Sequence, residues 1–221
     1  MNRPIVLAIT GASGAIYAAR LLQLLLANER IVHVTVSPSG AAVVKQELGI
    51  EMHLEQIQFA PLLQTTVPDG TCKPNDEAIR MAACQALEQG RLVYHRYNDY
   101  FTPIASGSFL TDGMVICPCS GSTLAGVVHA SSQNLIQRAA EVQLKEKRRL
   151  ILVPRETPLS VFQLENMLRA AQAGAILLPA MPGWYHGVRG LSDLVDFVVA
   201  RILDHLQIEH QLMQRWRASD L

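Results

Sequence analysis

The sequence predicts an α/β fold: a Rossmann-like (flavodoxin-like) parallel sheet with helices on both faces, formed as a single domain over residues 1–221. Short apolar segments alternate along the chain with longer segments of helical periodicity, as in repeated βαβ units. Most of the short segments are apolar throughout, which is expected of strands that are buried on both faces. A chain of 221 residues can bury a sizeable core without disulfides or metals.

Two strand–helix pairs open the chain. Residues 5–9 read Ile-Val-Leu-Ala-Ile and predict the first strand, which a helix over residues 14–28 follows. Residues 31–36 predict the second strand, and a helix is expected over residues 40–48. Because the strands are joined by helices, they are expected to lie parallel in one sheet.

An irregular insertion is expected at about residues 51–96, since residues 51–74 lack a strong period and are rich in proline and glycine. Within it, residues 75–89 predict a helix that Gly90 closes. Further strands are expected at 114–117, 150–153 and 175–178.

The last helix is the clearest element of the sequence. Apolar residues recur at 3.6-residue spacing from Leu191 to Leu206, behind Ser192 as the expected N-cap. Its apolar face is expected to pack on the sheet.

Composition excludes several classes of protein. The 19 Lys and Arg balance the 19 Asp and Glu, so no electrostatic footprint for nucleic acid or an anionic membrane is present. No apolar run has the roughly 18 residues needed to span a bilayer, and the start of the chain reads as strand and helix instead of a signal peptide. We therefore expect a cytoplasmic protein. Charged residues make up only 17% of the chain and hydrophobic residues 49%, which predicts leftover apolar surface and a homo-oligomer.

Cysteine and histidine spacing predicts no metal site. Cys117 and Cys119 are one residue apart, whereas Cys72 and Cys84 are distant, which suits neither a disulfide framework nor a zinc ribbon. All four are expected to be free thiols. The seven histidines show no H-E-x-x-H or other metal-ligand spacing.

The first candidate motif is Thr10-Gly11-Ala12-Ser13-Gly14-Ala15, between the first strand and its helix. Small residues let a ligand approach the backbone, and the amides of a helix N-terminus favour a phosphate. The structural alternative is a tight turn with Ser13 as cap. An NAD site is disfavoured because Ser37 stands where an acidic residue would be needed, and the Walker A sequence is absent.

The same residues nearly match the G-x-S-x-G elbow of serine hydrolases. We disfavour that class, because the elbow normally follows several strands and Ala15 replaces its last glycine.

A second strand-to-helix turn carries Ser120, Gly121, Ser122 and Thr123, whose hydroxyls and amides are expected at the carboxyl edge of the sheet. N-capping by Ser120 and core packing of Cys117 would explain this motif without a ligand. The recurrence of serines at predicted strand ends favours a phosphate-bearing cofactor; they are Ser13, Ser37, Ser106, Ser108 and Ser120.

Four charged residues lie beside these turns in the sequence. Arg138 and Lys145 are seven residues apart on one predicted helix and so share a face. Arg155 and Glu156 follow the strand that begins at residue 150, which places them at its carboxyl end. Each alone would usually be a solvated charge; their joint position indicates function.

The motifs together resemble the UbiX-type flavin prenyltransferases, within the superfamily of homo-oligomeric flavin-containing Cys decarboxylases. The resemblance covers almost the whole chain and is carried by residues 10–14, 117–120, 134–140, 152–156, 164–167, 182–185 and 215–216. The insertion at about residues 51–96 is longer than in the family, so nothing is carried over there. Decarboxylase relatives have a Pro-Ala-Ser-Ala-Asn-Thr motif and a catalytic histidine; this chain has Cys-Pro-Cys-Ser-Gly-Ser-Thr, which favours the prenyltransferase branch.

The resemblance implies that reduced FMN is prenylated at N5 and C6 by dimethylallyl monophosphate, without a metal, to make the cofactor of a UbiD-type decarboxylase. It implies a homo-oligomer, with a dodecamer as the expected form. The FMN-binding residues implied are Gly11, Ala12, Ser13, Ser37, Ser120, Gly121, Ser122, Thr123 and Arg138. The donor-binding residues implied, across a subunit boundary, are Lys145, Arg155, Glu156, Tyr185, Arg201 and Trp216. The catalytic candidates are Ser13, Glu47, Lys145 and Glu156.

This chemistry is consistent with the residue types. Cleavage of an allylic C–O bond needs cations at the leaving phosphate, which Lys145, Arg155 and Arg201 supply, and π faces at the prenyl carbon. The flavin ring, Tyr185 and Trp216 are candidates for those π faces. Glu47, Ser13 or the departed phosphate could take the proton from C6.

Each of these roles has a structural alternative. Glu47 could be an ordinary helix-surface acid, Arg201 a solvated charge and Trp216 an oligomer contact. An FMN carrier without chemistry, or a flavin-dependent decarboxylase of the same superfamily, remains the alternative function.

Overall fold

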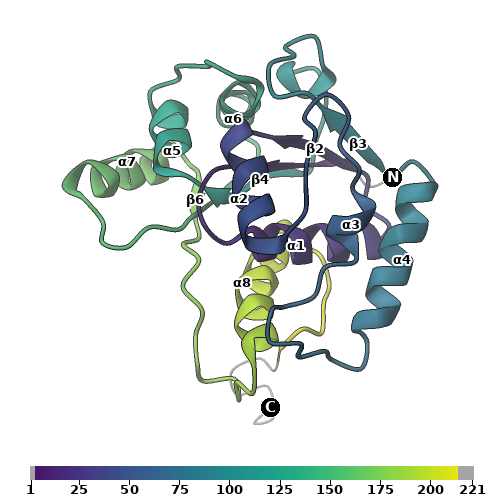
Figure 1. Cartoon of the computed structure of the whole chain (residues 1–221). Helices are drawn as coiled ribbons and strands as arrows, with labels where there is room; N and C mark the ends of the chain where they lie inside the picture. Colours follow the sequence, from purple (N-terminus) through teal and green to yellow (C-terminus); the bar gives the residue numbers. More distant parts are fainter. Residues whose placement is uncertain (1–2, 214–221) are drawn as a thin grey trace.

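Six parallel strands form the centre of the computed structural model, which describes residues 3–213 (Figure 1). Their order across the sheet is β3-β2-β1-β4-β5-β6. The chain therefore adds β2 and β3 on one side of β1 and then crosses to the other side to begin β4. Ligands of open α/β sheets bind at such a reversal, outside the carboxyl ends of the strands. The strands are β1 Ile5–Ile9, β2 Val32–Val36, β3 Leu92–His95, β4 Gly113–Cys119, β5 Leu150–Pro154 and β6 Ile176–Leu177.

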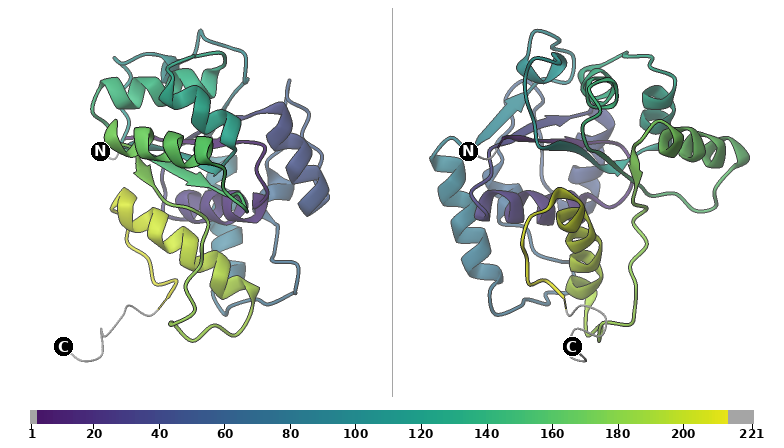
Figure 2. Two further views of the ribbon diagram at one scale, coloured as in Figure 1. Left: turned by 90° about the vertical axis from the view of Figure 1, so that its left-hand side faces the viewer. Right: turned by 180° about the vertical axis from the view of Figure 1, so that it is seen from behind.

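Helices cover both faces of the sheet, as the two views of Figure 2 show. One face carries α1 Ala15–Ala27, α3 Ala60–Leu63, α4 Asp76–Glu88 and α8 Leu191–Leu206. The other carries the short helix η1 Pro103–Ala105 with α5 Gly121–Val128, α6 Leu135–Lys145 and α7 Val161–Gln172. Helix α2, Pro38–Leu48, follows β2. The Rossmann-like α/β fold predicted from the sequence is confirmed.

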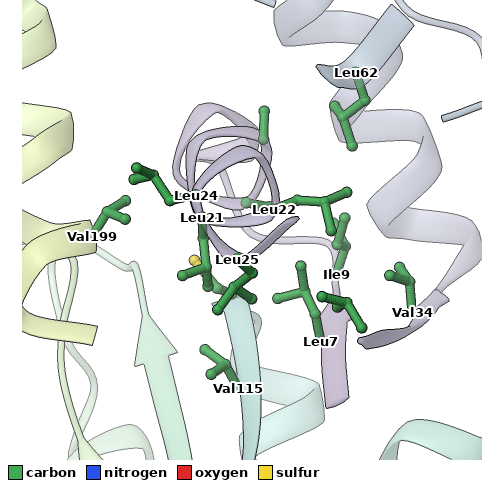
Figure 3. Close-up of a cluster of buried hydrophobic side chains, with 14 of the residues drawn as sticks. Leu7, Ile9, Leu21, Leu22, Leu24, Leu25, Val34, Leu62, Val115 and Val199 are labelled. Carbon is green, nitrogen blue, oxygen red and sulfur yellow. The ribbon is translucent and has the colours of Figure 1, made fainter. Parts of the chain in front are cut away.

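The larger core lies between β1, β4 and the leucine-rich face of α1 (Figure 3). Leu21, Leu22 and Leu25 of α1 are fully buried in this core. Leu7 of β1 and Val115 of β4 belong to the same cluster, whereas the alternate strand residues face a second cluster under α5 and α6. Both faces of the central strands are thus apolar, which explains their uninterrupted hydrophobic sequence.

A buried ion-pair network attaches α8 and the start of α4 to α1. The Arg20 guanidinium donates from Nε to Asp196 and from Nη2 to Asp76, each at 2.7 Å. Lys73 Nζ also lies 2.7 Å from Asp196 and 2.9 Å from Asp193. Every buried charge in the network therefore has an opposite partner, as a buried ion must.

Two details of the sequence prediction were wrong. The region expected as an irregular insertion contains α3 as well as α4, and it ends in the edge strand β3. Strand β3 is only half-buried, so its four residues lack the continuous apolar pattern of the central strands. The N-cap of α8 is Gly190, and Ser192 lies inside the helix. The Asp193 carboxylate accepts hydrogen bonds from the backbone amides of Arg189 and Gly190, just before the helix begins.

No helix within the part of the chain that the structure describes is long and apolar enough to cross a membrane.

A buried histidine pair lies between β2 and β3. His33 Nδ1 is 2.8 Å from His95 Nε2, and the rings are stacked beside Phe109. Burial and the neighbouring His95 lower the pKa of His33 from 6.5 to about 4, and burial also lowers the pKa of His95. Both rings are therefore neutral in the folded protein at pH 7, and one of the two facing nitrogens donates a hydrogen bond to the other.

We predict that this pair makes the protein less stable in acid. The unfolded chain takes up protons near pH 6.5 while folded His33 does so only near pH 4, so stability falls as the pH drops between these values. The loss reaches about 3 kcal/mol for His33. Urea unfolding followed from pH 7.5 to 4.5 measures it. His33→Asn should flatten the dependence, and exposed His129→Asn should leave it unchanged; equal slopes in all three proteins would contradict the prediction.

Candidate functional site

The candidate site lies where the carboxyl ends of β1 and β4 meet, and Thr10 joins the two turns there. The Thr10 hydroxyl donates to the carbonyl of Pro118 at 2.7 Å and accepts the amide of Ser120 at 2.8 Å. Its own amide donates to Pro118 at 3.3 Å. Thr10 is buried, so these bonds are shielded from water. They set the distance between the turn before α1 and the turn before α5.

Two glycines let the turn after β1 approach its neighbours. A Cβ on Gly11 would lie 2.4 Å from Cβ of Ser39, so a larger residue would push α2 away. Gly14 has a φ of +115°, a conformation that side chains disfavour, and a Cβ there would also contact the Tyr17 ring. Two of the small residues noted in the sequence, Gly11 and Gly14, are therefore required by backbone geometry.

Glu47 from α2 occupies the N-terminus of α1. Its carboxylate accepts the amide of Gly14 at 3.0 Å and that of Ala15 at 2.8 Å. A carboxylate at this position satisfies amides that have no partner within the helix and complements the helix dipole. The first amides of α1 are thus held by the protein itself.

Helices α2 and α5 begin beside this turn, each with a serine cap. Ser37 accepts the amide of Gly40 at 2.9 Å, and its own amide donates to Ile9 of β1. Ser120 accepts the amide of Thr123 and lies 2.9 Å from the Thr123 hydroxyl and 3.2 Å from the Ser122 hydroxyl. Hydroxyls and first-turn amides therefore converge on one edge, where they can bind an anion.

Arg155 and Glu156 reach this edge from the end of β5. Arg155 Nε donates to the carbonyl of Ser13 at 3.3 Å, across the end of β4. The Glu156 carboxylate accepts Gln163 Nε2 of α7 at 3.3 Å, and the same amide group lies against Gly121 of α5. A cation and an anion are thus held beside the two turns that Thr10 joins.

Tyr17 adds an aromatic ring to the site. It lies on the first turn of α1, under Gly14. Burial raises the pKa of its hydroxyl, Cys117 raises it further, and the nearby Arg155 cation lowers it. The Tyr17 ring therefore lies close to the turn after β1, to Cys117 of β4 and to the Arg155 guanidinium.

The cysteines of the second motif are packing residues. Cys117 and Cys119 are free and fully buried, on opposite faces of β4. Burial raises the pKa of both thiols, that of Cys119 to about 12. They are therefore protonated and unsuited to nucleophilic chemistry.

Two other expected site residues, Arg138 and Lys145, lie toward opposite ends of α6. Arg138 donates to the carbonyl of Ala105 and to Glu141, at the start of α6. Lys145 is at the other end of α6, paired with Glu146 at 2.6 Å. Lys145 thus lies toward the amino edge of the sheet, opposite the edge that carries Arg155 and Glu156.

Tyr185 and Arg201 are also apart from Arg155. Tyr185 is exposed and packs edge-on against Phe197 of α8, and Arg201 pairs with Asp204 on the same helix. Figure 1 shows the segment between β6 and α8 leaving the sheet. Ser106 and Ser108 bond to each other beside the carbonyls that Arg148 contacts, at the amino end of β5, and not at a carboxyl end as expected. Trp216 lies outside the described residues.

Sequence reasoning missed Tyr17 and Gln163 as site residues, and it included Thr10 in the first motif without assigning it a role. Thr10 had one available signal: a polar residue at the end of a fully apolar strand. Tyr17 and Gln163 had none, since a helix periodicity does not show which neighbour a side chain meets. Within residues 3–213, no group of three or more His, Cys, Asp or Glu side chains is placed to hold a metal ion.

Comparisons with known proteins agree on one family. Residues 1–203 match the family described as Flavoprotein. The flavin prenyltransferase UbiX of Halalkalibacterium halodurans is 43% identical over 208 residues, which cover 94% of this chain and 90% of that protein.

Solved structures are similar over nearly the full length. The crystal structure of AnUbiX (PadA1) in complex with FMN and dimethylallyl pyrophosphate has a TM-score of 0.78 and 34% identity, covering 98% of both chains. A dodecameric FMN-dependent UbiX-like decarboxylase from Escherichia coli O157:H7 has a TM-score of 0.74 and 33% identity, covering 96% of this chain and 98% of that one.

We predict that Glu47→Ala lowers stability by about 1 kcal/mol, because two first-turn amides of α1 lose their acceptor. Thermal unfolding of the variant measures this loss. The matched control is Gln46→Ala, an exposed neighbour on the same helix. If the two variants unfold at the same temperature as the unmodified protein, Glu47 does not cap α1.

Proposed function

This chain belongs to the flavoprotein family as a flavin prenyltransferase of the UbiX type, and from that premise we propose how its residues bind FMN and the prenyl donor. The enzyme class follows from the family match and from relatives of more than 40% identity over almost the whole chain. The observation that carries the residue assignment is the Thr10 connection, which brings the two donor-rich turns together.

The turns at the carboxyl edge fit FMN. A flavin mononucleotide needs donors for its phosphate and ribityl groups and a backbone without side chains against its ring. Glu47 already holds the first amides of α1, so we assign the polar groups of FMN to the capped starts of α2 and α5. The contacts proposed are Gly11, Ala12, Ser13, Ser37, Ser120, Gly121, Ser122, Thr123 and Arg138.

The donor phosphate is proposed to bind beside Arg155. That guanidinium already reaches the turn after β1, where it can balance the charge that grows on the phosphate as the allylic C–O bond breaks. Glu156, held by Gln163, orients this end of the site. The Tyr17 ring offers a π face to the allylic carbon, which gains positive charge in the same step.

FMN, when bound in reduced form, supplies the nucleophilic N5 and then C6, which we propose receive the dimethylallyl group. The proton at C6 must then be removed. Ser13, exposed on the turn after β1, and the departed phosphate are the proposed acceptors. Glu47 remains a candidate for that role, although its hydrogen bonds to the α1 amides favour positioning of the turn.

A neighbouring subunit is proposed to complete the site. Lys145, Tyr185 and Arg201 are distant from Arg155 within one chain, so their role in donor binding requires another copy. Large apolar side chains are exposed on α7 and between β6 and the start of α8, as expected of a surface that a second subunit covers. They are Val161, Phe162, Leu164, Leu168, Met181, Trp184 and Leu191. A dodecamer, the state of the E. coli structure, is the assembly we propose. The recipient of the product is proposed to be a UbiD-type decarboxylase.

The test is the mass of the flavin after anaerobic incubation of the enzyme with reduced FMN and dimethylallyl monophosphate. We predict that the flavin gains one dimethylallyl unit. Arg155→Ala should slow this gain about a hundredfold while FMN affinity stays within about threefold, because the contact strengthens as the phosphate departs. Arg155→Lys, which keeps the charge, should restore part of the rate.

Two outcomes would contradict the proposal. Flavin that binds but keeps its mass would indicate a carrier. A loss of FMN affinity in Arg155→Ala that parallels the loss of rate would assign this arginine to the flavin and not to the donor.

A further inference from the structure

A cluster of four arginines lies at the amino edge of the sheet, opposite the proposed flavin site. The N mark of Figure 1 shows where the chain enters this edge. The cluster surrounds a hollow of about 420 Å³, lined by Arg3, Arg30, Thr111, Asp112, Arg148, Arg149, Leu206 and Gln207. Four arginines and one aspartate line it, in a chain whose formal net charge is zero. This local charge is not explained by the prenyl transfer reaction.

Arg30 is held in place in the wall of the hollow by the fold. It is nine-tenths buried, donates from Nη2 to the carbonyl of Arg3 at 3.0 Å and pairs with Asp112. Its Nε is buried and has no hydrogen-bond partner among the described residues. A buried cationic donor without an acceptor is uncommon, and an anion in the hollow could supply one after a small shift of the guanidinium.

The other three arginines differ in whether their side chains form hydrogen bonds within the protein. Arg148 donates to the carbonyls of Gly107 and Phe109 and lies 3.9 Å from the Glu146 carboxylate, which fixes its guanidinium at the rim. The side chains of Arg3 and Arg149 make no hydrogen bond or ion pair within residues 3–213, and both line the hollow. The single carboxylate, Asp112, is already paired with Arg30, so two cations remain available.

We propose that this hollow binds a small oligophosphate, either free pyrophosphate or the phosphate chain of a nucleotide. Guanidinium groups form paired hydrogen bonds with phosphate oxygens, and several together suit a multiply charged anion. The lining contains no aromatic ring, and Leu206 is its one apolar residue. The hollow therefore offers contacts to the phosphate groups of a ligand and no stacking surface for a nucleotide base. The volume is within the range of small-molecule sites.

The test is calorimetric titration of the FMN-saturated protein with pyrophosphate and, separately, with ATP, at constant ionic strength in potassium chloride. The double variant R3Q/R149Q removes the two unpaired cations and leaves Arg30 and Arg148 in place. We expect it to bind pyrophosphate at least about tenfold more weakly than the unmodified protein. Arg155→Ala, changed at the opposite edge where the donor phosphate is proposed to bind, should keep the pyrophosphate binding that R3Q/R149Q loses, even if it loses binding at the donor site.

Each outcome decides the proposal. Tighter binding of ATP than of pyrophosphate, lost in R3Q/R149Q, would support the hollow as a nucleotide phosphate site; equal binding, lost in the same variant, would support free oligophosphate. Absence of binding, or binding that Arg155→Ala abolishes and R3Q/R149Q retains, would overturn it. Prenyl transfer is expected to be unchanged in R3Q/R149Q, so failure here leaves the proposed catalytic residues unaffected.

Discussion

The hydroxyl group of Thr10 is the contact on which the geometry of the proposed flavin site depends. It accepts from Ser120 and donates to Pro118, and so it fixes two turns that belong to distant parts of the sequence. A buried hydroxyl with both roles satisfied resists displacement, because breaking either bond leaves a polar group without a partner. The amide-rich start of α5 and the glycine-rich start of α1 are consequently held at one separation. A rigid scaffold of this kind is needed to place reacting groups accurately.

Three helices begin near this contact, and they are not equivalent. Glu47 satisfies the N-terminus of α1 from within the protein, whereas α2 and α5 begin with serine caps and further hydroxyls. An anion would meet repulsion beside Glu47 and attraction at the other two starts. The division directs a phosphate-bearing ligand to one side of the turn and leaves Arg155, with Tyr17, on the side where the prenyl donor is proposed to react.

The sequence predicted the central fold well, because β1, β4 and β5 are buried on both faces and are mostly continuous apolar runs, and β2 carries a valine at every second position. It failed for β3, a four-residue edge strand with three half-buried residues, inside a segment without strong periodicity. The motif turns were found from small residues and serines, but the bond that joins them was not, since Thr10 and Ser120 are 110 residues apart. Lys145 shows the limit of spacing arguments. It lies two helical turns beyond Arg138 on α6, at the opposite edge of the sheet. The proposed contact of Lys145 with the prenyl donor therefore requires the Lys145 of a second copy of the chain.

The most direct test of the central role of Thr10 is the FMN affinity of Thr10→Val, measured by quenching of flavin fluorescence. Valine keeps the shape of the side chain and removes the hydroxyl, and Thr10→Ser, which keeps the hydroxyl, is the matched control. We predict that FMN binds Thr10→Val about tenfold more weakly, as expected for the loss of a buried hydrogen-bonding group, and binds Thr10→Ser nearly as well as the unmodified protein. A folded Thr10→Val protein with unchanged FMN affinity would contradict the account.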